Sequence, residues 1–356
     1  MGSDFNQWVQ IALSDQVFPQ VNALEVLSDD TDLLRLTMAA GDVRMAYFGR
    51  QVMLHRINDI QNGLCPEDCG YCAQSKISEA PIKQYPLKSE EEIIQEAHEA
   101  KAKGVYRYCM VSSGRGPTAA RTQHLAHIIR RIKTEVGIQT CLSAGLVNSE
   151  QASVLKAAGL DRLNHNLNTS ESHTPDIVTT HTFQDRIDTL QSARSAGLDL
   201  CSGMIAGMGE TDQDIIDVAY KLQEYQVPSI PINFLIPIPG NPIYDCNQLT
   251  PQRCLRILCL FRFVNPKAEI RIGGGREGHL RGLQTLALYP ANSLFVEGYL
   301  ATRGHNVDQV YQLIHDAGFE VVGEKPVSRD RRSADQYQLD DNPDILNPKT
   351  TTSIPR

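Results

Sequence analysis

The chain has 356 residues, of which 41% are hydrophobic, and a formal net charge of −8 at pH 7. This length fits one large α/β barrel with extensions or two ordinary domains, and the acidic balance argues against nucleic-acid binding. The N-terminal sequence MGSDFNQWVQ does not resemble a signal peptide, and apolar runs such as Ile257–Phe261 are too short to span a bilayer. We therefore expect a cytoplasmic protein that binds no membrane, whose nine cysteines serve metal or redox chemistry rather than disulfides.

The N-terminal part of the chain is predicted to lead into a barrel. Residues 1–50 are expected to form a helical extension, with helical patterns at Asp30–Met38 and Val43–Phe48. Gln51–Ile57 is the first predicted strand. The segment Asn62–Ser75 follows soon afterwards, so we expect it to lie just beyond the C-terminal end of that strand.

This segment, which we call the cysteine loop, reads NGLCPEDCGYCAQS and places Cys65, Cys69 and Cys72 in a C-x3-C-x2-C pattern. Its glycines and proline oppose a regular helix or strand, so the backbone can wrap around one centre. A 4Fe–4S cluster takes four ligands, and only three cysteines lie nearby. One iron would be open to a non-protein ligand, and Tyr71 offers an aromatic side chain beside it.

A structural zinc site is the alternative interpretation of the same loop. It would need a distant fourth ligand, for example His55. Structural zinc loops normally combine a short cysteine pair with a second pair of cysteines or histidines at a fixed distance. No such second pair follows here, and the iron–sulfur interpretation is therefore favoured.

Beyond the loop, helical patterns end in glycine and pass directly into strand patterns. A glycine in the left-handed conformation commonly ends a helix, and strands alternating with helices indicate a parallel sheet. The predicted helices are Glu90–Lys103, Thr122–Val136, Ser149–Ala158 and Phe183–Ala196, ended by Gly104, Gly137, Gly159 and Gly197. Later strands are predicted at Ser229–Leu235, Glu269–Gly273 and Ser293–Gly298, with a last helix at Val307–Ala317.

These units predict a (β/α)8 TIM-type barrel over residues 51–324, with a partial (β/α)6 barrel as the second choice. Residues 325–356 are polar, contain proline and charge, and have few aliphatic side chains. We expect this C-terminal tail to be disordered.

Three further cysteines lie at matching depths on different predicted strands. Cys109 comes five residues after the preceding helix-ending glycine, and Cys141 and Cys201 come four residues after theirs; Asn164 takes this place in a fourth strand. Equal depths converge on one layer inside a parallel barrel. Each thiol alone is more often inert core packing, but three at one depth predict a shared inner site.

Arg271 is a candidate for the same layer, because it lies mid-strand among apolar residues in EIRIGGGRE. A buried arginine needs a negative partner. A thiolate-bound cluster would provide one, and so would a carboxylate inside the barrel.

The cysteine triplet is similar to that of radical S-adenosylmethionine enzymes, and the wider motif set resembles the biotin synthase family from about Asn62 to Phe319. The motifs NGLCPEDCGYCAQS, YCMVSSGRGP, LNHNLNTS, LCSGMIAGMGET, IPINFL and EIRIGGGREG occur in that order. The resemblance implies radical insertion of sulfur into dethiobiotin, started by S-adenosylmethionine cleavage at a 4Fe–4S cluster, with sulfur from a 2Fe–2S cluster. It also implies an electron donor such as flavodoxin or ferredoxin, and a homodimer.

The resemblance further implies a role for each matching residue. The 4Fe–4S ligands would be Cys65, Cys69 and Cys72, and the 2Fe–2S ligands Cys109, Cys141, Cys201 and Arg271. S-adenosylmethionine would contact Tyr71, Asn168, Arg186, Gly203, Ile205, Gly207 and Glu210, and dethiobiotin would contact Asn166, Asn233 and Thr302.

Three positions depart from the family pattern. Asn168 stands where Asp is common, Gly273 where Ser is common, and Arg303 follows Thr302 where a second Thr is expected. The competing hypotheses are a related radical S-adenosylmethionine enzyme acting on another small molecule, a non-enzymatic iron–sulfur carrier or sensor, and a zinc-stabilised barrel.

Overall fold

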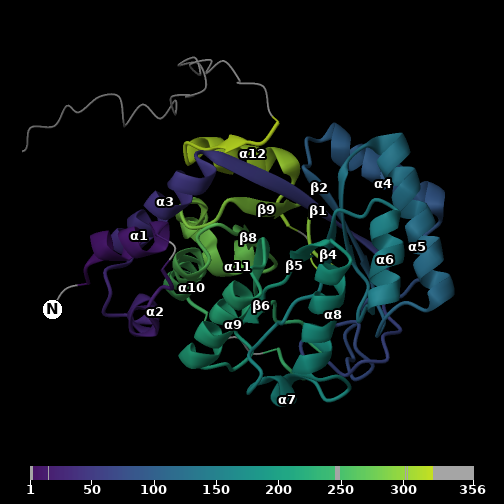
Figure 1. The fold of residues 1–356 in the computed structure, drawn as a ribbon, viewed down its shortest axis with the longest axis horizontal. Coiled ribbons are helices and arrows are strands. Elements are labelled where there is room, and N and C mark those ends of the chain that lie inside the picture. Colours follow the sequence, from purple (N-terminus) through teal and green to yellow (C-terminus); the bar gives the residue numbers. More distant parts are fainter. Residues whose placement is uncertain (1–2, 15, 245–248, 301, 303, 324–356) are drawn as a thin grey trace, which may run out of the picture. The chain divides into compact units, whose positions relative to one another are not determined.

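A closed barrel of parallel strands forms the centre of the computed structural model (Figure 1). The structure describes residues 3–14, 16–244, 249–300, 302 and 304–323. The predicted disordered tail at 325–356 lies outside the described residues, as do Cys246 and Arg303. Among the described residues, no helix is long and apolar enough to cross a membrane.

The barrel closes because its first and last long strands pair with each other. The order around the sheet is β1, β2, β3, β4, β5, β7, β8 and β9, and β1 pairs in parallel with both β2 and β9. β6 continues the course of β5 and pairs with β7, so the two segments act as one interrupted strand. The predicted (β/α)8 barrel is confirmed, and the partial (β/α)6 alternative is wrong. The strands are β1 Gln51–Gln61, β2 Arg107–Ser112, β3 Gln139–Ser143, β4 Arg162–Asn164, β5 Asp199–Cys201, β6 Met204–Ala206, β7 Ser229–Phe234, β8 Glu269–Ile272, β9 Ser293–Val296 and β10 Glu320–Val321.

Helices surround the barrel, and most begin at a side-chain cap. Serine, threonine or asparagine oxygens accept backbone N–H groups at the starts of α4, α5, α6, α8, α9, α10 and α12, which satisfies donors that have no partner within the helix. The four predicted helix-ending glycines all have φ between 68° and 92°. The helices that follow β1 are α4 Glu90–Ala102, α5 Ala119–Arg131 (continued by one π turn, Ile132–Val136), α6 Ser149–Ala157, α7 Thr174–Ile177, α8 Phe183–Ser195, α9 Asp212–Glu224, α10 Pro251–Val264, α11 Arg276–Leu280, two 3-10 turns at Arg281–Leu283 and Leu286–Leu288, and α12 Val307–Asp316.

The N-terminal extension consists of α1 Phe5–Leu13, α2 Gln20–Leu27 and α3 Leu33–Phe48, which pack beside α10 (Figure 1). The two predicted helical segments are parts of one helix, α3, and the first two helices were not predicted. Gly41 does not break α3. Its Cα lies against the ring of Tyr289, so that an added Cβ would come within 3.0 Å of a ring carbon. The helix thus uses this glycine for close packing.

The register of the strands explains why distant cysteines meet. Cys109 on β2 lies opposite Cys141 on β3, and Asn164 on β4 lies opposite Cys201 on β5. Side chains alternate across a strand, so these positions share the inner face of the barrel.

Candidate active site

A cavity of about 390 Å³ opens among the segments that follow the C-terminal ends of the strands. This is the end at which parallel barrels carry their active sites. The cavity brings together most of the predicted site residues: Cys65, Cys69, Tyr71, Cys72, Cys109, Cys141, Asn166, Asn168, Arg186, Cys201, Ile205, Asn233, Arg271 and Thr302. Gly203, Gly207 and Glu210 do not line it.

The cysteine loop is a series of tight turns joined to two other loops. Cys72 N donates to Cys69 O at 3.1 Å, and Cys65 N donates to Gln74 O at 3.3 Å. Gly70 N donates to Ile177 O at 2.9 Å, and Gly70 O accepts from the backbone N–H of residue 243 at 2.9 Å. The loop is thus supported by segments that lie far away in the sequence.

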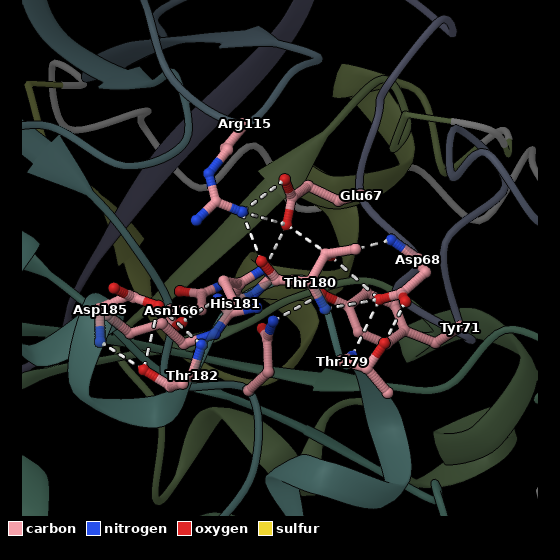
Figure 2. Close-up of polar contacts among 12 residues, drawn as sticks. Glu67, Asp68, Tyr71, Arg115, Asn166, Thr179, Thr180, His181, Thr182 and Asp185 are labelled. Carbon is pink, nitrogen blue, oxygen red and sulfur yellow. Dashed lines mark hydrogen bonds and ion pairs between the residues drawn. The ribbon is translucent and has the colours of Figure 1, made fainter.

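Two acidic side chains of the cysteine loop connect it to residues 179–181, and Asp68 is the first of them (Figure 2). Its Oδ1 accepts from Thr179 N at 2.9 Å and Thr180 N at 3.1 Å, and it lies 3.0 Å from Thr180 Oγ1. Although burial opposes ionisation, these hydrogen bonds hold the pKa of Asp68 below its usual range. Asp68 therefore ties the turn between the first two loop cysteines to the segment before α8.

Glu67 makes the second connection and is buried, with 6% of its surface exposed. It accepts hydrogen bonds from Thr180 Oγ1 at 2.7 Å and from Arg115 Nη1 at 3.1 Å, and it contacts His181 Nδ1 (Figure 2). Burial opposes ionisation, but these hydrogen bonds keep the pKa of Glu67 below its usual range. A buried carboxylate thus stands beside the cysteines with its charge compensated.

Arg186 on α8 links this network to the cavity. Its Nη2 lies 2.6 Å from His181 Nε2, and its Nη1 donates to Asn166 O at 2.8 Å. Its charge favours the thiolate form of Cys69. Arg186 therefore faces the cysteine loop, which agrees with its expected contact with S-adenosylmethionine.

Burial suppresses ionisation of the Cys69 and Cys72 thiols. It raises the pKa of Cys69 to about 12, against the opposing effect of the Arg186 charge, and that of Cys72 to about 11. Metal ligation requires thiolates, so binding of iron would have to drive deprotonation.

Tyr71 and Asn168 form the wall between the loop and the end of β4. Asn168 Nδ2 donates to Tyr71 Oη at 2.5 Å. Asn168 has a φ of 68° and exchanges backbone hydrogen bonds with Gly203 and Ile205. Asparagine tolerates this left-handed conformation better than most residues, so the departure from Asp at this position keeps the local backbone.

The three inner cysteines converge as predicted. Cys109, Cys141 and Cys201 form a buried cluster with Phe295. Asn164 Nδ2 donates to Cys201 Sγ at 3.2 Å. A hydrogen bond between the Cys109 and Cys141 thiols lowers the pKa of Cys109, and the same bond raises the pKa of Cys141 to about 12. One barrel layer therefore holds three sulfur atoms within mutual reach.

Arg271 lies at this layer and is 1% exposed. Its Nη1 lies 3.7 Å from Cys201 Sγ, and its Nη2 donates to Ser229 Oγ at 2.8 Å and to Glu269. From the sequence, the negative partner of Arg271 could be either a thiolate-bound cluster or a carboxylate inside the barrel. The structure shows the carboxylate of Glu269 on one side of the guanidinium and a thiol on the other.

Glu269 is the centre of a buried polar group beneath the inner cysteines. Its carboxylate accepts from Arg162 Nη1 at 2.8 Å and from Ser293 Oγ at 2.9 Å. Burial opposes its charge, but Arg271 and the neighbouring groups hold the pKa of Glu269 well below its usual range. His55 Nε2 lies 2.9 Å from the same carboxylate, and burial lowers the pKa of His55 to about 3, so its ring is neutral.

The position of His55 removes the proposed fourth ligand of a zinc site. It contacts Glu269 beneath the inner layer and does not line the cavity with the loop cysteines. Moreover, within the described part of the chain no three His, Cys, Asp or Glu side chains converge closely enough to hold a single ion. Two separate sets of three cysteines on one cavity fit iron–sulfur clusters, which are larger than one ion and take thiolates.

Gly203, Gly207 and Glu210 shape the backbone near the cavity, although they do not line it. A Cβ on Gly203 would come within 1.8 Å of Pro231 O, so β6 can approach β7 only without a side chain here. Glu210 accepts the N–H groups of Gly207 and Met208, both at 2.7 Å, and so closes its own turn.

The departure at Gly273 also has a local explanation. A Cβ on Gly273 would come within 2.3 Å of Asn233 Oδ1, which accepts from Gly274 N at 2.9 Å. A side chain at 273 would therefore meet Asn233 first. Thr302 lines the cavity, and its buried Oγ1 has no hydrogen-bond partner among the residues that the structure describes. This hydroxyl can therefore bind a ligand.

Sequence reasoning missed the residues that hold the cysteine loop. Glu67 and Asp68 lie between the first two cysteines in CPEDC, and their partners lie in the TTHT run at 179–182. Two adjacent acids inside a proposed ligand loop were a signal, because a carboxylate beside a cluster needs a compensating partner.

Comparisons with known proteins agree with this geometry. Residues 62–222 match the Radical SAM superfamily, and residues 231–320 match the Biotin and Thiamin Synthesis associated domain. The biotin synthase of Acaryochloris marina is 84% identical over 343 residues, covering 96% of this chain and 99% of the relative. That of Magnetococcus marinus is 50% identical over 313 residues, covering 88% of this chain and 98% of the relative.

Solved structures with the same fold are more distant in sequence. Methylornithine synthase (PylB) superposes with a TM-score of 0.75 at 19% identity, covering 88% of this chain and 97% of that one. The FeFe-hydrogenase maturase HydG of Carboxydothermus hydrogenoformans gives 0.74 at 18% identity, covering 89% and 79%. These likenesses concern the barrel alone.

Proposed function

The chain belongs to the biotin synthase family of radical S-adenosylmethionine enzymes, and from this premise we propose that its two sets of cysteines divide the reaction between them. The enzyme inserts sulfur into dethiobiotin to form biotin, and it uses S-adenosylmethionine and an iron–sulfur centre. The family membership excludes the competing hypotheses of a plain carrier or a zinc-stabilised barrel. Convergence of six cysteines from a loop and three strands on one cavity carries the assignment of the site.

In the outer part of the site, Cys65, Cys69 and Cys72 hold a 4Fe–4S cluster. When bound, such a cluster supplies the electron that cleaves S-adenosylmethionine and so starts hydrogen abstraction from an unactivated carbon. The chain contributes a loop that offers three thiols and leaves one coordination position for the ligand. Arg186 faces that position with a cation, which suits a carboxylate.

In the inner part, Cys109, Cys141, Cys201 and Arg271 hold a 2Fe–2S cluster, which supplies the sulfur atom. The strand register supports this assignment, because Cys109 and Cys141 lie opposite each other on neighbouring strands and Cys201 lies opposite Asn164 on the next pair of strands. Glu269 and Ser229 hold Arg271 from the other side. The protein thereby keeps a cation beside a site that carries negative thiolates.

The substrates lie between the two layers. Ile205, Asn168 and Tyr71 form the wall for S-adenosylmethionine, with Gly203, Gly207 and Glu210 shaping the turn behind it. Asn166, Asn233 and the hydroxyl of Thr302 are the polar contacts for dethiobiotin. A largely apolar cavity with a few placed polar groups orients a substrate and excludes water.

Three further proposals follow from the family rather than from any contact in the chain. The electron donor is a flavodoxin or ferredoxin, the enzyme works as a homodimer, and it acts in the cytoplasm. Chromatographic mass and a reconstituted reductase assay would test the first two.

The direct test of the function is an anaerobic assay of the reconstituted protein with dethiobiotin, S-adenosylmethionine and a reductant. We expect biotin and 5′-deoxyadenosine, detected by mass spectrometry. Formation of 5′-deoxyadenosine without biotin, at full occupancy of both clusters, would contradict the substrate assignment.

A further inference from the structure

His181 connects the cysteine loop to Arg186, and we propose that it is a positioning residue that aims Arg186 at the carboxylate of S-adenosylmethionine. The proposal rests on the proposed function, because it concerns how the protein holds Arg186, the residue assigned there to S-adenosylmethionine. Both ring nitrogens of His181 are already engaged by Glu67 and Arg186, so we do not assign it as a cluster ligand. It contacts Glu67 on one side (Figure 2). On the other side, its Nε2 contacts Arg186 Nη2.

The contacts of the imidazole define its protonation. Arginine has only N–H donors, so His181 Nε2, 2.6 Å from Arg186 Nη2, must accept. The remaining ring proton then lies on Nδ1, where the carboxylate of Glu67 accepts it. His181 is thus a neutral imidazole with one tautomer, and it passes a hydrogen bond from the arginine to the carboxylate.

The surroundings favour the same neutral state. His181 is 8% exposed, and the ionisable groups that interact with it are Arg186, Glu67, Arg115, Asp185 and His165. Burial and the Arg186 charge lower the pKa of His181, although the carboxylate opposes this effect. Protonated histidine would place two cations in contact inside the protein.

The consequence for Arg186 is a fixed guanidinium plane. Nη2 is held by His181 and Nη1 by Asn166 O at 2.8 Å, so rotation about the end of the side chain is blocked. An arginine held in this way retains N–H donors for a carboxylate and loses less conformational freedom when that ligand binds. Glu67, in turn, belongs to the cysteine loop. The position of Arg186 is therefore linked to the position of the outer ligands.

Two substitutions separate positioning from packing. In His181→Asn, the side-chain amide can still donate to Glu67, but the shorter side chain places no acceptor at the position of Nε2, where Arg186 donates. In His181→Gln, the amide oxygen reaches the place of Nε2 and can accept from Arg186. The exposed His124, on α5, provides the control His124→Gln, which makes the same chemical change away from the cavity.

The experiment uses the reconstituted full chain and measures S-adenosylmethionine affinity from the change it causes in the electron paramagnetic resonance spectrum of the reduced outer cluster. We expect His181→Asn to weaken binding about tenfold, and His181→Gln to stay within about threefold of the parent. Maximal S-adenosylmethionine cleavage at saturation should remain within about twofold in both, since only ligand positioning is lost. Iron, sulfide and thermal unfolding are measured for every variant.

The result that would overturn the proposal is equal behaviour of the two variants. Equal affinity at the parent level would show that the histidine contact is unnecessary. Equal loss, together with loss of iron, would show that His181 only supports the fold of the loop. Failure of the parent chain itself to respond to S-adenosylmethionine would instead contradict the proposed function.

Discussion

The two sets of cysteines on the cavity are held by different means. Cys65, Cys69 and Cys72 lie on a loop, and side chains from a segment more than a hundred residues later support it. Cys109 and Cys141 lie on the neighbouring strands β2 and β3, and Cys201 lies on β5 beyond β4, so the backbone ladder sets their spacing. The comparison teaches that the inner site is a product of strand register, whereas the outer site depends on hydrogen bonds between loops.

The two sites share one electrostatic device. Each has a buried arginine that is fixed by a buried glutamate, through His181 for Arg186 and directly for Arg271. A buried guanidinium without such a partner would be strongly unfavourable. The four predictions that follow test whether the two sites are independent, starting with the largest effect.

Cys69→Ala should abolish S-adenosylmethionine cleavage, because the outer centre would lose one of its three ligands. The measurement is 5′-deoxyadenosine released under reducing conditions. Cys259→Ala, which removes a buried thiol on α10 away from the cavity, is the control and should retain cleavage. Undiminished cleavage in Cys69→Ala would remove this residue from the ligand set.

Cys141→Ala should abolish biotin formation but leave S-adenosylmethionine cleavage in place, because it removes an inner thiol only. The two products are measured in the same reaction. A normal biotin yield would show that Cys141 is core packing, and a simultaneous loss of cleavage would show that the two sites are coupled.

Glu269→Gln should destabilise the barrel by about 3 kcal/mol, because it leaves the buried charges of Arg162 and Arg271 without a compensating carboxylate. Chemical denaturation of the reconstituted protein measures the free energy of unfolding. We also expect a smaller content of inner cluster at unchanged outer content. Unchanged stability would mean that the buried thiols alone compensate these arginines.

Asp68→Asn should have the smallest effect, about 1 kcal/mol of stability, because the amide keeps the shape and part of the bonding to Thr179 and Thr180. A looser cysteine loop should raise the apparent KM for S-adenosylmethionine about threefold, with biotin formed per cleavage unchanged. A lower yield of biotin per cleavage event would indicate that the loop also affects the inner site.

Much of both sites could be predicted from the sequence because the signals were local or periodic. The spacing of Cys65, Cys69 and Cys72 is a local pattern, and the depth of Cys109, Cys141 and Cys201 could be counted from helix-ending glycines. Both patterns depend on backbone geometry that recurs in every βα unit, and the structure brings the residues together accordingly.

The remainder depends on tertiary contacts that no spacing encodes. The pairing of Glu67 and Asp68 with the 179–182 segment joins two loops whose meeting depends on the whole barrel. The negative partner of Arg271 could not be predicted, because a strand pattern does not show which neighbouring strand contributes a carboxylate. Similarly, the two predicted helical segments left residues 39–42 unassigned, whereas α3 continues through them with Gly41 packed against Tyr289.

The most direct test of the two-site account is a count of clusters. The protein is reconstituted anaerobically, iron and acid-labile sulfide are determined per chain, and Mössbauer spectra distinguish the cluster types, with Cys141→Ala treated in parallel. The account predicts a 4Fe–4S and a 2Fe–2S signal in the parent chain and loss of the 2Fe–2S signal alone in the variant. A parent chain that takes up only the 4Fe–4S cluster would contradict the inner site and, with it, the proposed source of sulfur.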